Sequence, residues 1–131
     1  MVKITLDHSA LIFYHRHPGI KQLIDMHRQG SIRLYHATNA DYELEELNEE
    51  ERKAYEQLRA IIFGNNHITL TQHGDLCLLI KHMNFHRDYF VTLYPENYGD
   101  AEKYFKNLDI RFPDEEFIKE LQRKIGKKQR K

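Results

Sequence analysis

The feature that most constrains the fold is the alternation of short apolar segments with longer amphipathic ones along the 131 residues. The short segments are rich in β-branched and aromatic residues, as buried strands are. Strands that are separated by helices pair in parallel within one sheet. We therefore expect an α/β fold with a mostly parallel central sheet. The expected strands are VKITL (2–6), SIRLYHA (31–37), DYFVTLY (88–94) and DIRF (109–112), with HITLT (67–71) as a possible short one.

The segments between these strands carry the start and stop signals of helices. A capping box, Asn48 with Glu51, is expected to open the second part of a helical region over 38–64, and Gly64 to end it. The last helix is expected to begin at Pro113 and Asp114 and to end at Gly126. The expected helices are 8–17, 18–30, 38–64 in two parts, 75–83, 99–108 and 113–126.

Composition narrows the classes of protein that this chain can be. Twenty basic and twenty acidic residues cancel, so no global field attracts nucleic acid or an anionic membrane. Cys77 is the one cysteine, which excludes an intramolecular disulfide and a cysteine-based zinc cluster, and its apolar surroundings predict a buried thiol. There is neither an apolar run of ~20 residues nor a signal-peptide pattern. We expect a cytoplasmic protein with a single domain over 1–126 and a basic C-terminal tail over 127–131.

Three carboxylates fall where this topology would bring them together. Asp7 follows the first strand, Glu43 lies on the helix after the second, and Asp75 opens the helix that leads to DYFVTLY. Asp7 has two interpretations: it caps a helix, or it stands at the carboxyl edge of the sheet, where open α/β folds bind their ligands. The other two acids favour the second interpretation for Asp7.

A cluster of acids repels itself unless a cation neutralises it. Oxygen ligands suit a hard divalent ion, so Mg²⁺ or Mn²⁺ is the expected cofactor. A cation held by carboxylates activates water and neutralises the charge that builds on a phosphate. The chemistry expected of such a cluster is hydrolysis of a phosphodiester, with water as the nucleophile. Ser9 is expected to orient Asp7 by a hydrogen bond.

The first half of the chain resembles the opening of PIN domains. In ITLDHSALIF (4–13) an aspartate after the first strand is followed by a small hydroxyl residue and an apolar helix. In TNADYELEEL (38–47) a threonine precedes an acidic helix that contains the pair Glu43–Leu44. Both patterns are similar to PIN motifs in the same order.

The second half continues this resemblance. In DLCLLIKHMNFHRDYFVTLY (75–94) an aspartate begins a buried helix, and a strand follows that ends in Val91–Thr92. NLDIRFPDEEFIKEL (107–121) has a short strand, a proline and an amphipathic helix, like the usual ending of the family. The resemblance implies a three-layer α/β/α sandwich.

The resemblance also implies a function. PIN domains are Mg²⁺- or Mn²⁺-dependent ribonucleases, often dimeric, and include the toxins of toxin–antitoxin pairs. On this basis Asp7, Glu43 and Asp75 are the catalytic and metal-binding carboxylates, and Ser9 and Thr92 support them. The expected partners are RNA, an antitoxin protein and a second copy of the chain, with no membrane.

The chain departs from the family pattern at Tyr94, where PIN domains usually carry a further aspartate. A phenol with a reference pKa of ~10 is a poor ligand for a hard cation. Glu96 and Asp100 lie nearby and are candidates to supply an oxygen instead. The departure leaves an alternative open, a catalytically inactive PIN-like scaffold that binds RNA or protein.

Other residues have weaker functional interpretations. His8 adjoins the expected site and is a candidate for contact with substrate or metal. A basic rim and the tail are candidates for RNA phosphates, and Tyr14 and Tyr35 for base stacking; ordinary surface positions explain them equally well. The rim is His15, Arg16, His17, Lys21, Arg28 and Arg33. We expect His15, His17, His82 and His86 to be scattered surface histidines, and Phe117, Ile118 and Leu121 to pack in the core.

Overall fold

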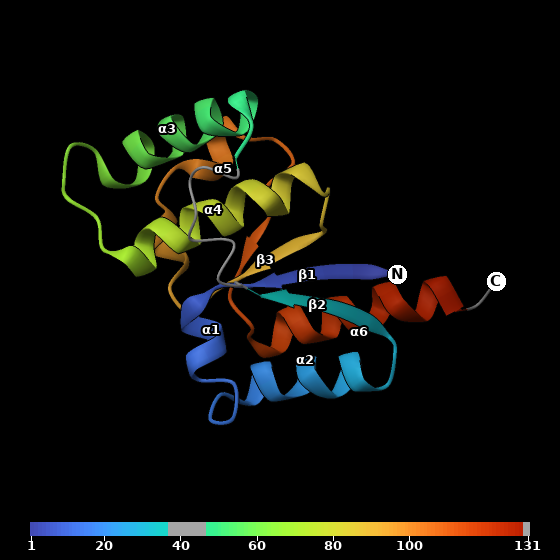
Figure 1. Cartoon of the computed structure of the whole chain (residues 1–131). Helices are drawn as coiled ribbons and strands as arrows, with labels where there is room; N and C mark the ends of the chain where they lie inside the picture. The colour runs from blue at the N-terminus through green and yellow to red at the C-terminus, as the bar shows by residue number, and fades with distance from the viewer. Residues whose placement is uncertain (37–46, 130–131) are drawn as a thin grey trace.

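A computed structural model describes residues 1–36 and 47–129, and in them a parallel sheet of four strands forms the centre of the molecule (Figure 1). The strand order is β2-β1-β3-β4, and every neighbouring pair is parallel. The strand β1 therefore lies inside the sheet, between β2 and β3. The strands are β1 (Val2–Leu6), β2 (Ile32–His36), β3 (Tyr89–Val91) and β4 (Ile110–Arg111).

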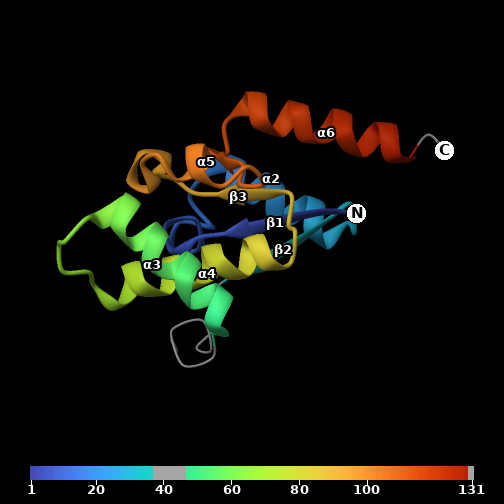
Figure 2. The ribbon, with the colours of Figure 1, turned by 90° about the horizontal axis from the view of Figure 1, so that it is seen from above.

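Helices cover both faces of this sheet, which confirms the expected three-layer α/β/α architecture (Figures 1 and 2). The helices α2 and α6 form one outer layer, and α3, α4 and α5 form the other. The helices are α1 (His8–Ile12), α2 (Pro18–Arg28), α3 (Glu49–Phe63), α4 (Leu70–Asn84), the 3-10 helix η3 (Pro95–Tyr98), α5 (Ala101–Tyr104) and α6 (Glu115–Gln129).

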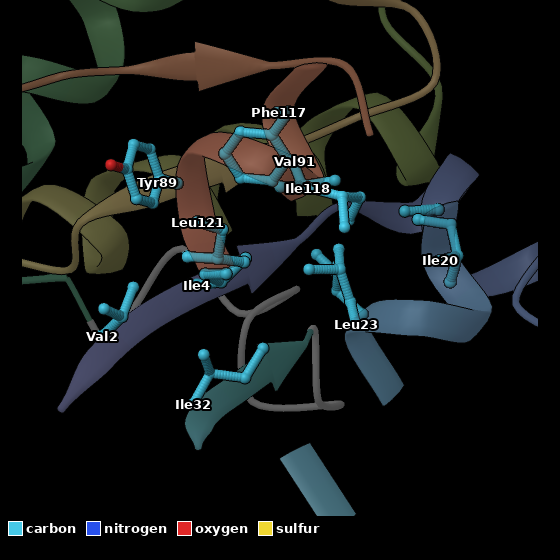
Figure 3. Close-up of a cluster of buried hydrophobic side chains, with 12 residues drawn as sticks. Val2, Ile4, Ile20, Leu23, Ile32, Tyr89, Val91, Phe117, Ile118 and Leu121 are labelled. Carbon is cyan, nitrogen blue, oxygen red and sulfur yellow. The ribbon is translucent and has the colours of Figure 1, made fainter. Parts of the chain in front are cut away.

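The period of two along the strands divides the core between the two faces. Ile4 of β1 faces α2 and α6, where it meets Leu23 and Leu121 (Figure 3). Phe90 of β3 faces the other way and packs with Leu79 of α4. Phe117, Ile118 and Leu121 are buried, as expected, and so is Cys77.

The α2/α6 layer has one very close approach. A Cβ built on Gly19 would lie 1.9 Å from the carbonyl oxygen of Pro113. Only glycine leaves room for this contact. The start of α2 is thereby packed directly against the segment that leads into α6.

Local signals explain most helix ends. Asn48 and Glu51 form the expected capping box at the start of α3, and Gly64 follows its last residue. The Asp114 carboxylate accepts a 2.8 Å hydrogen bond from the Phe117 N–H at the start of α6. Residues 38–46, which belong to the expected first part of the helical region 38–64, lie outside the described residues.

Several expectations about the helices and turns are wrong. HITLT forms no strand, because Thr69 caps α4 by a capping box with Gln72. The helix α4 therefore begins at Leu70, so Asp75 lies inside it and does not open it. The helix expected over 99–108 is reduced to α5, and α6 runs through Gly126 to Gln129.

The structure also fixes the two ends of the molecule. The chain enters β1 at the amino edge of the sheet, and α6 ends on this same side, while α1 lies at the opposite, carboxyl edge (Figures 1 and 2). In the described residues, no helix has the length and the apolar character needed to cross a bilayer.

Candidate active site

Asp7 stands at the carboxyl end of the central strand β1. Its N–H donates to the Val91 carbonyl at 3.1 Å, which continues the pairing of β1 with β3. Its carboxylate accepts from the Ala10 N–H at 3.0 Å and so caps α1. Both interpretations of Asp7 from the sequence therefore describe its position: it is a helix cap, and it lies at the sheet edge where α/β folds bind ligands.

Two hydroxyl groups hold the Asp7 carboxylate from either side. Ser9 donates to Oδ1 at 2.6 Å, and Tyr98 donates to Oδ2 at 2.7 Å. With the Ala10 N–H, Asp7 accepts three hydrogen bonds while only 3 % of its surface is exposed. A carboxylate has about four acceptor positions, so one remains for another partner. Burial and the negative charge of Asp7 raise the Tyr98 pKa well above its usual value, so the phenol stays a donor.

A chain of hydroxyl contacts joins Asp7 to the segment after β3. The Ser9 and Thr92 hydroxyls are 3.3 Å apart. Backbone N–H groups complete the chain: Leu93 donates to Ser9 Oγ, and Tyr94 donates to Thr92 Oγ1, each at 3.1 Å. Residues 92–94 are therefore fixed relative to the carboxylate.

Asp75 is the second carboxylate of the site. It is partly buried on α4, and its Oδ1 accepts from the His8 N–H at 3.2 Å. Burial, and next the negative charge of Asp7, raise the Asp75 pKa, the hydrogen bond from the His8 N–H opposes them, and the net result is a pKa of about 7. The two acids are thus close enough to repel each other.

Both acids line one cavity of about 420 Å³. A third acid, Glu96, lies on its wall, and the amides of Gln72 and Asn97 add polar groups. The apolar part of the wall comes from Ile62, Phe63 and Leu76, and Tyr94 and Tyr98 lie beside it. Of the described residues that line the cavity, none is basic. The cavity therefore has the electrostatic character of a cation site.

The remaining expected site residues divide into three cases. Glu43 lies outside the described residues. Asp100 is exposed and pairs with Lys103 at 3.2 Å, whereas Glu96 reaches the cavity. Within residues 1–36 and 47–129, no three His, Cys, Asp or Glu side chains gather as a metal site.

The residues that are present fit a hard divalent cation. Mg²⁺ is commonly held by one or two carboxylates and completes its coordination with water and substrate oxygens. Asp7 and Asp75 supply two carboxylates. Their negative charges repel each other, and a bound cation would neutralise both charges. Asp7 has a free acceptor position for it.

The sequence does not indicate Tyr98, Gln72, Asn97 or Phe63 as residues of the cavity. Tyr98 reaches Asp7 only because η3 turns the chain back after β3. Gln72 carries a helix signal, the T-x-x-Q capping box, but no functional one. A spacing in the sequence does not reveal which loop side chains turn toward a cavity.

A second buried polar cluster lies between β1 and α4. His82 Nδ1 is 2.8 Å from Thr5 Oγ1, which also accepts from Arg87 at 3.3 Å. The Arg87 guanidinium lies 4.0 Å from the centre of the Tyr35 ring. His82 is fully buried, and its Nε2 has no hydrogen-bond partner among the residues that the structure describes.

Burial of His82 corrects the expectation that it is a surface histidine. Burial, and next the positive charge of Arg87, lower its pKa to about 4. It is therefore a neutral core residue. His86 follows the end of α4 in the left-handed region, with φ 53°, so the two histidines do not share a helix face.

The fold and the cavity define an α/β protein with two interacting carboxylates at the carboxyl edge of a parallel sheet. Comparisons with protein families, with curated proteins and with solved structures give no match.

Proposed function

We propose that this protein is a divalent-metal-dependent ribonuclease that hydrolyses RNA phosphodiester bonds. The observation that carries the proposal is the pair Asp7 and Asp75, which line one cavity. Burial, and next the negative charge of Asp7, raise the Asp75 pKa there. We assign Asp7, Asp75 and Glu43 as the ligands of Mg²⁺ or Mn²⁺, and Glu96 as a further oxygen ligand at the cavity wall.

The chain's own residues prepare the site for this chemistry. The Ala10 N–H and the Ser9 and Tyr98 hydroxyls fix the Asp7 carboxylate in one orientation. The His8 N–H holds Asp75 in the same way. A bound cation would lower the pKa of an attacking water and would neutralise negative charge on the phosphate. These hydrogen bonds orient the two carboxylates before a cation binds.

The PIN-like assignment and its biological setting belong to this proposal. The order β1–Asp7–Ser9, then Asp75 on α4, then β3–Thr92, then β4 and α6 supports a PIN-like domain. We place it in the cytoplasm as a homodimer, and as the toxin of a toxin–antitoxin pair whose partner is an antitoxin protein.

One observation favours a second function, an inactive PIN-like scaffold that binds RNA or protein. Tyr94 lines the cavity where the resemblance implies a further acid. In the described part of the chain, Asp7, Asp75 and Glu96 line one cavity, yet no group of three His, Cys, Asp or Glu side chains is placed to hold a metal ion. The scaffold predicts a cavity that binds its partner without cleavage.

The test compares the wild type with Asp7→Asn in millimolar Mn²⁺ and in EDTA. Asparagine caps helices as well as aspartate does, so the variant keeps the start of α1 while it loses the charge. We expect Mn²⁺ to stabilise the wild type by about 2.7 kcal/mol at a concentration 100 times Kd, seen as a rise in Tm. Asp7→Asn should lose this rise and lose Mn²⁺-dependent cleavage of single-stranded RNA.

Asp25→Asn is the matched control, because Asp25 is an exposed carboxylate of α2. It should respond to Mn²⁺ as the wild type does. Equal cleavage by the wild type and Asp7→Asn would contradict the nuclease proposal. If the wild type binds RNA but shows neither cleavage nor a rise in Tm with Mn²⁺, the inactive scaffold is the function instead.

A further inference from the structure

Tyr94 is an exposed aromatic residue on a fixed backbone. Its side chain is 45 % exposed and lines the same cavity as Asp7 and Asp75. Its N–H is held by Thr92 Oγ1, and the hydroxyl contacts from Thr92 through Ser9 lead to Asp7. Four residues later, Tyr98 is bound to the other oxygen of the same carboxylate. The position of residue 94 is thus fixed from both sides.

The exposed part of this ring leaves apolar surface in contact with water. Within the described residues, the Tyr94 side chain makes neither a hydrogen bond nor a ring contact. Ile62 and Phe63, which are partly exposed and line the cavity with it, add apolar surface. A flat ligand that stacks on the ring would remove this surface from water.

The cavity joins this apolar wall to the two carboxylates. Its volume of about 420 Å³ is within the usual range of sites that hold small molecules. A ligand that suits both walls has a planar aromatic part and an anionic part that a cation can bridge to the acids. A nucleotide has both, and the amides of Gln72 and Asn97 can hydrogen-bond the edge of its base.

The other tyrosines considered for stacking are less suitable. The Arg87 guanidinium already lies 4.0 Å from the Tyr35 ring centre. Tyr14 packs edge-on with His15 and does not line the cavity. Tyr94 is the candidate that combines an open ring with proximity to the acids.

We propose that Tyr94 is the stacking surface for a nucleobase of single-stranded RNA, adjoining the phosphate that faces Asp7 and Asp75. The inference rests on the proposed function for its choice of ligand, and it adds a residue that binds the base and not the cation. Stacking on an aromatic side chain accepts every base, so Tyr94 gives affinity and position with little sequence preference.

The chain contains no tryptophan, so Tyr94→Trp creates a single fluorescent reporter at this position. The variant is titrated with an adenylate RNA hexamer and with a hexamer that has the same backbone but no bases, each in Mn²⁺ and in EDTA. We expect the adenylate hexamer to quench the indole and the abasic hexamer to leave it unchanged. Tyr104→Trp is the control at a tyrosine that is 69 % exposed and lies outside the cavity, and it should show no quenching.

A second measurement uses the anisotropy of the labelled adenylate hexamer with unlabelled protein. Loss of one base stack corresponds to roughly 5- to 150-fold weaker binding, which we expect for Tyr94→Leu. Tyr94→Phe keeps the ring and should bind within about twofold of the wild type. Leucine is apolar without a π face, so the pair separates stacking from simple burial.

Equal quenching by the two hexamers, or tight binding by Tyr94→Leu, overturns the inference. So does a wild type that binds no RNA. Failure of the nuclease proposal is a different result: base-dependent quenching with no cleavage in Mn²⁺ keeps the role of Tyr94 and removes the enzyme. If cleavage depends on Asp7 but both hexamers quench the indole equally, the nuclease proposal stands and the role of Tyr94 is removed.

Discussion

Thr5 and Asp7 lie two residues apart at the end of β1, and each begins a buried polar cluster, yet the two clusters differ in kind. Thr5 joins His82 and Arg87 in closed packing. Asp7 joins Ser9 and Tyr98 beside an open cavity and faces a second acid. Burial of polar groups alone therefore does not identify a functional site. The distinguishing features are the cavity and the repulsion between like charges.

The two clusters also respond to pH in opposite directions. Burial keeps His82 neutral by lowering its pKa to about 4, and it raises the Asp75 pKa to about 7. The unfolded chain binds the His82 proton more readily, so this cluster gains stability as pH rises from about 4 to 6.5. The folded chain binds the Asp75 proton more readily, so the other cluster loses stability as pH rises from about 4 to 7.

The largest expected effect comes from Asp75→Asn. Without metal, ionisation of Asp75 lowers the stability of the folded chain as pH rises from about 4 to 7, by up to about 4 kcal/mol in total, because burial and the charge of Asp7 raise its pKa to about 7. The variant keeps an oxygen for the His8 N–H and should be more stable than the wild type at pH 8. Urea unfolding in EDTA at pH 5 and pH 8 measures the difference.

Asp25→Asn serves again as the control, and it should leave the pH dependence of the wild type unchanged. A wild type and an Asp75→Asn variant with the same change in unfolding free energy between these pH values would show that Asp75 is an ordinary surface carboxyl. The contrast between the two clusters would then disappear.

His82→Gln tests the closed cluster. Acidification from pH 6.5 to 4 should reduce the stability of the wild type through His82 by up to about 3 kcal/mol, because only the unfolded chain takes up that proton. The variant has no such group, so its unfolding free energy should change less over this range. His15→Gln removes an exposed histidine and should keep the wild-type profile; a matching profile for His82→Gln would contradict the prediction.

The smallest effects come from removal of one hydroxyl in each cluster. Tyr98→Phe and Thr5→Val should each destabilise the protein by about 1–3 kcal/mol, because a buried partner loses its hydrogen bond. Only Tyr98→Phe should also weaken Mn²⁺ binding, by about 10- to 100-fold, as expected when a ligand loses an orienting contact. Calorimetric titration with Mn²⁺ distinguishes the two, and an equal loss of affinity in Thr5→Val would remove the distinction between the clusters.

The fold followed from the sequence where the local signal and the tertiary packing agree. The alternation of periods gave the parallel sheet, and the Asn48–Glu51 capping box marked the start of α3. The prediction failed where two local signals compete. In HITLT the β-branched residues suggested a strand, but the capping box of Thr69 and Gln72 begins a helix.

The candidate site was predictable only in part, for a different physical reason. Asp7 was found because it follows a strand that ends at the carboxyl edge of the sheet, and Asp75 because the helix that leads into a parallel strand begins near that same edge. Their positions depend on regular secondary structure, which periodicity reveals. Tyr98 depends on the turn of η3, and His82 on which side of α4 faces the sheet, and neither is determined by local spacing.

The arrangement of the chain ends has a practical consequence. Entry into β1 and the end of α6 lie on the amino side of the sheet, opposite α1 (Figure 1). Asp7 stands between β1 and α1, so the cavity that it lines is on the side away from both ends. A protein attached to a sensor surface, or joined to a fusion partner, through either end would present the cavity outward. Immobilisation would then leave the approach of an RNA strand unobstructed.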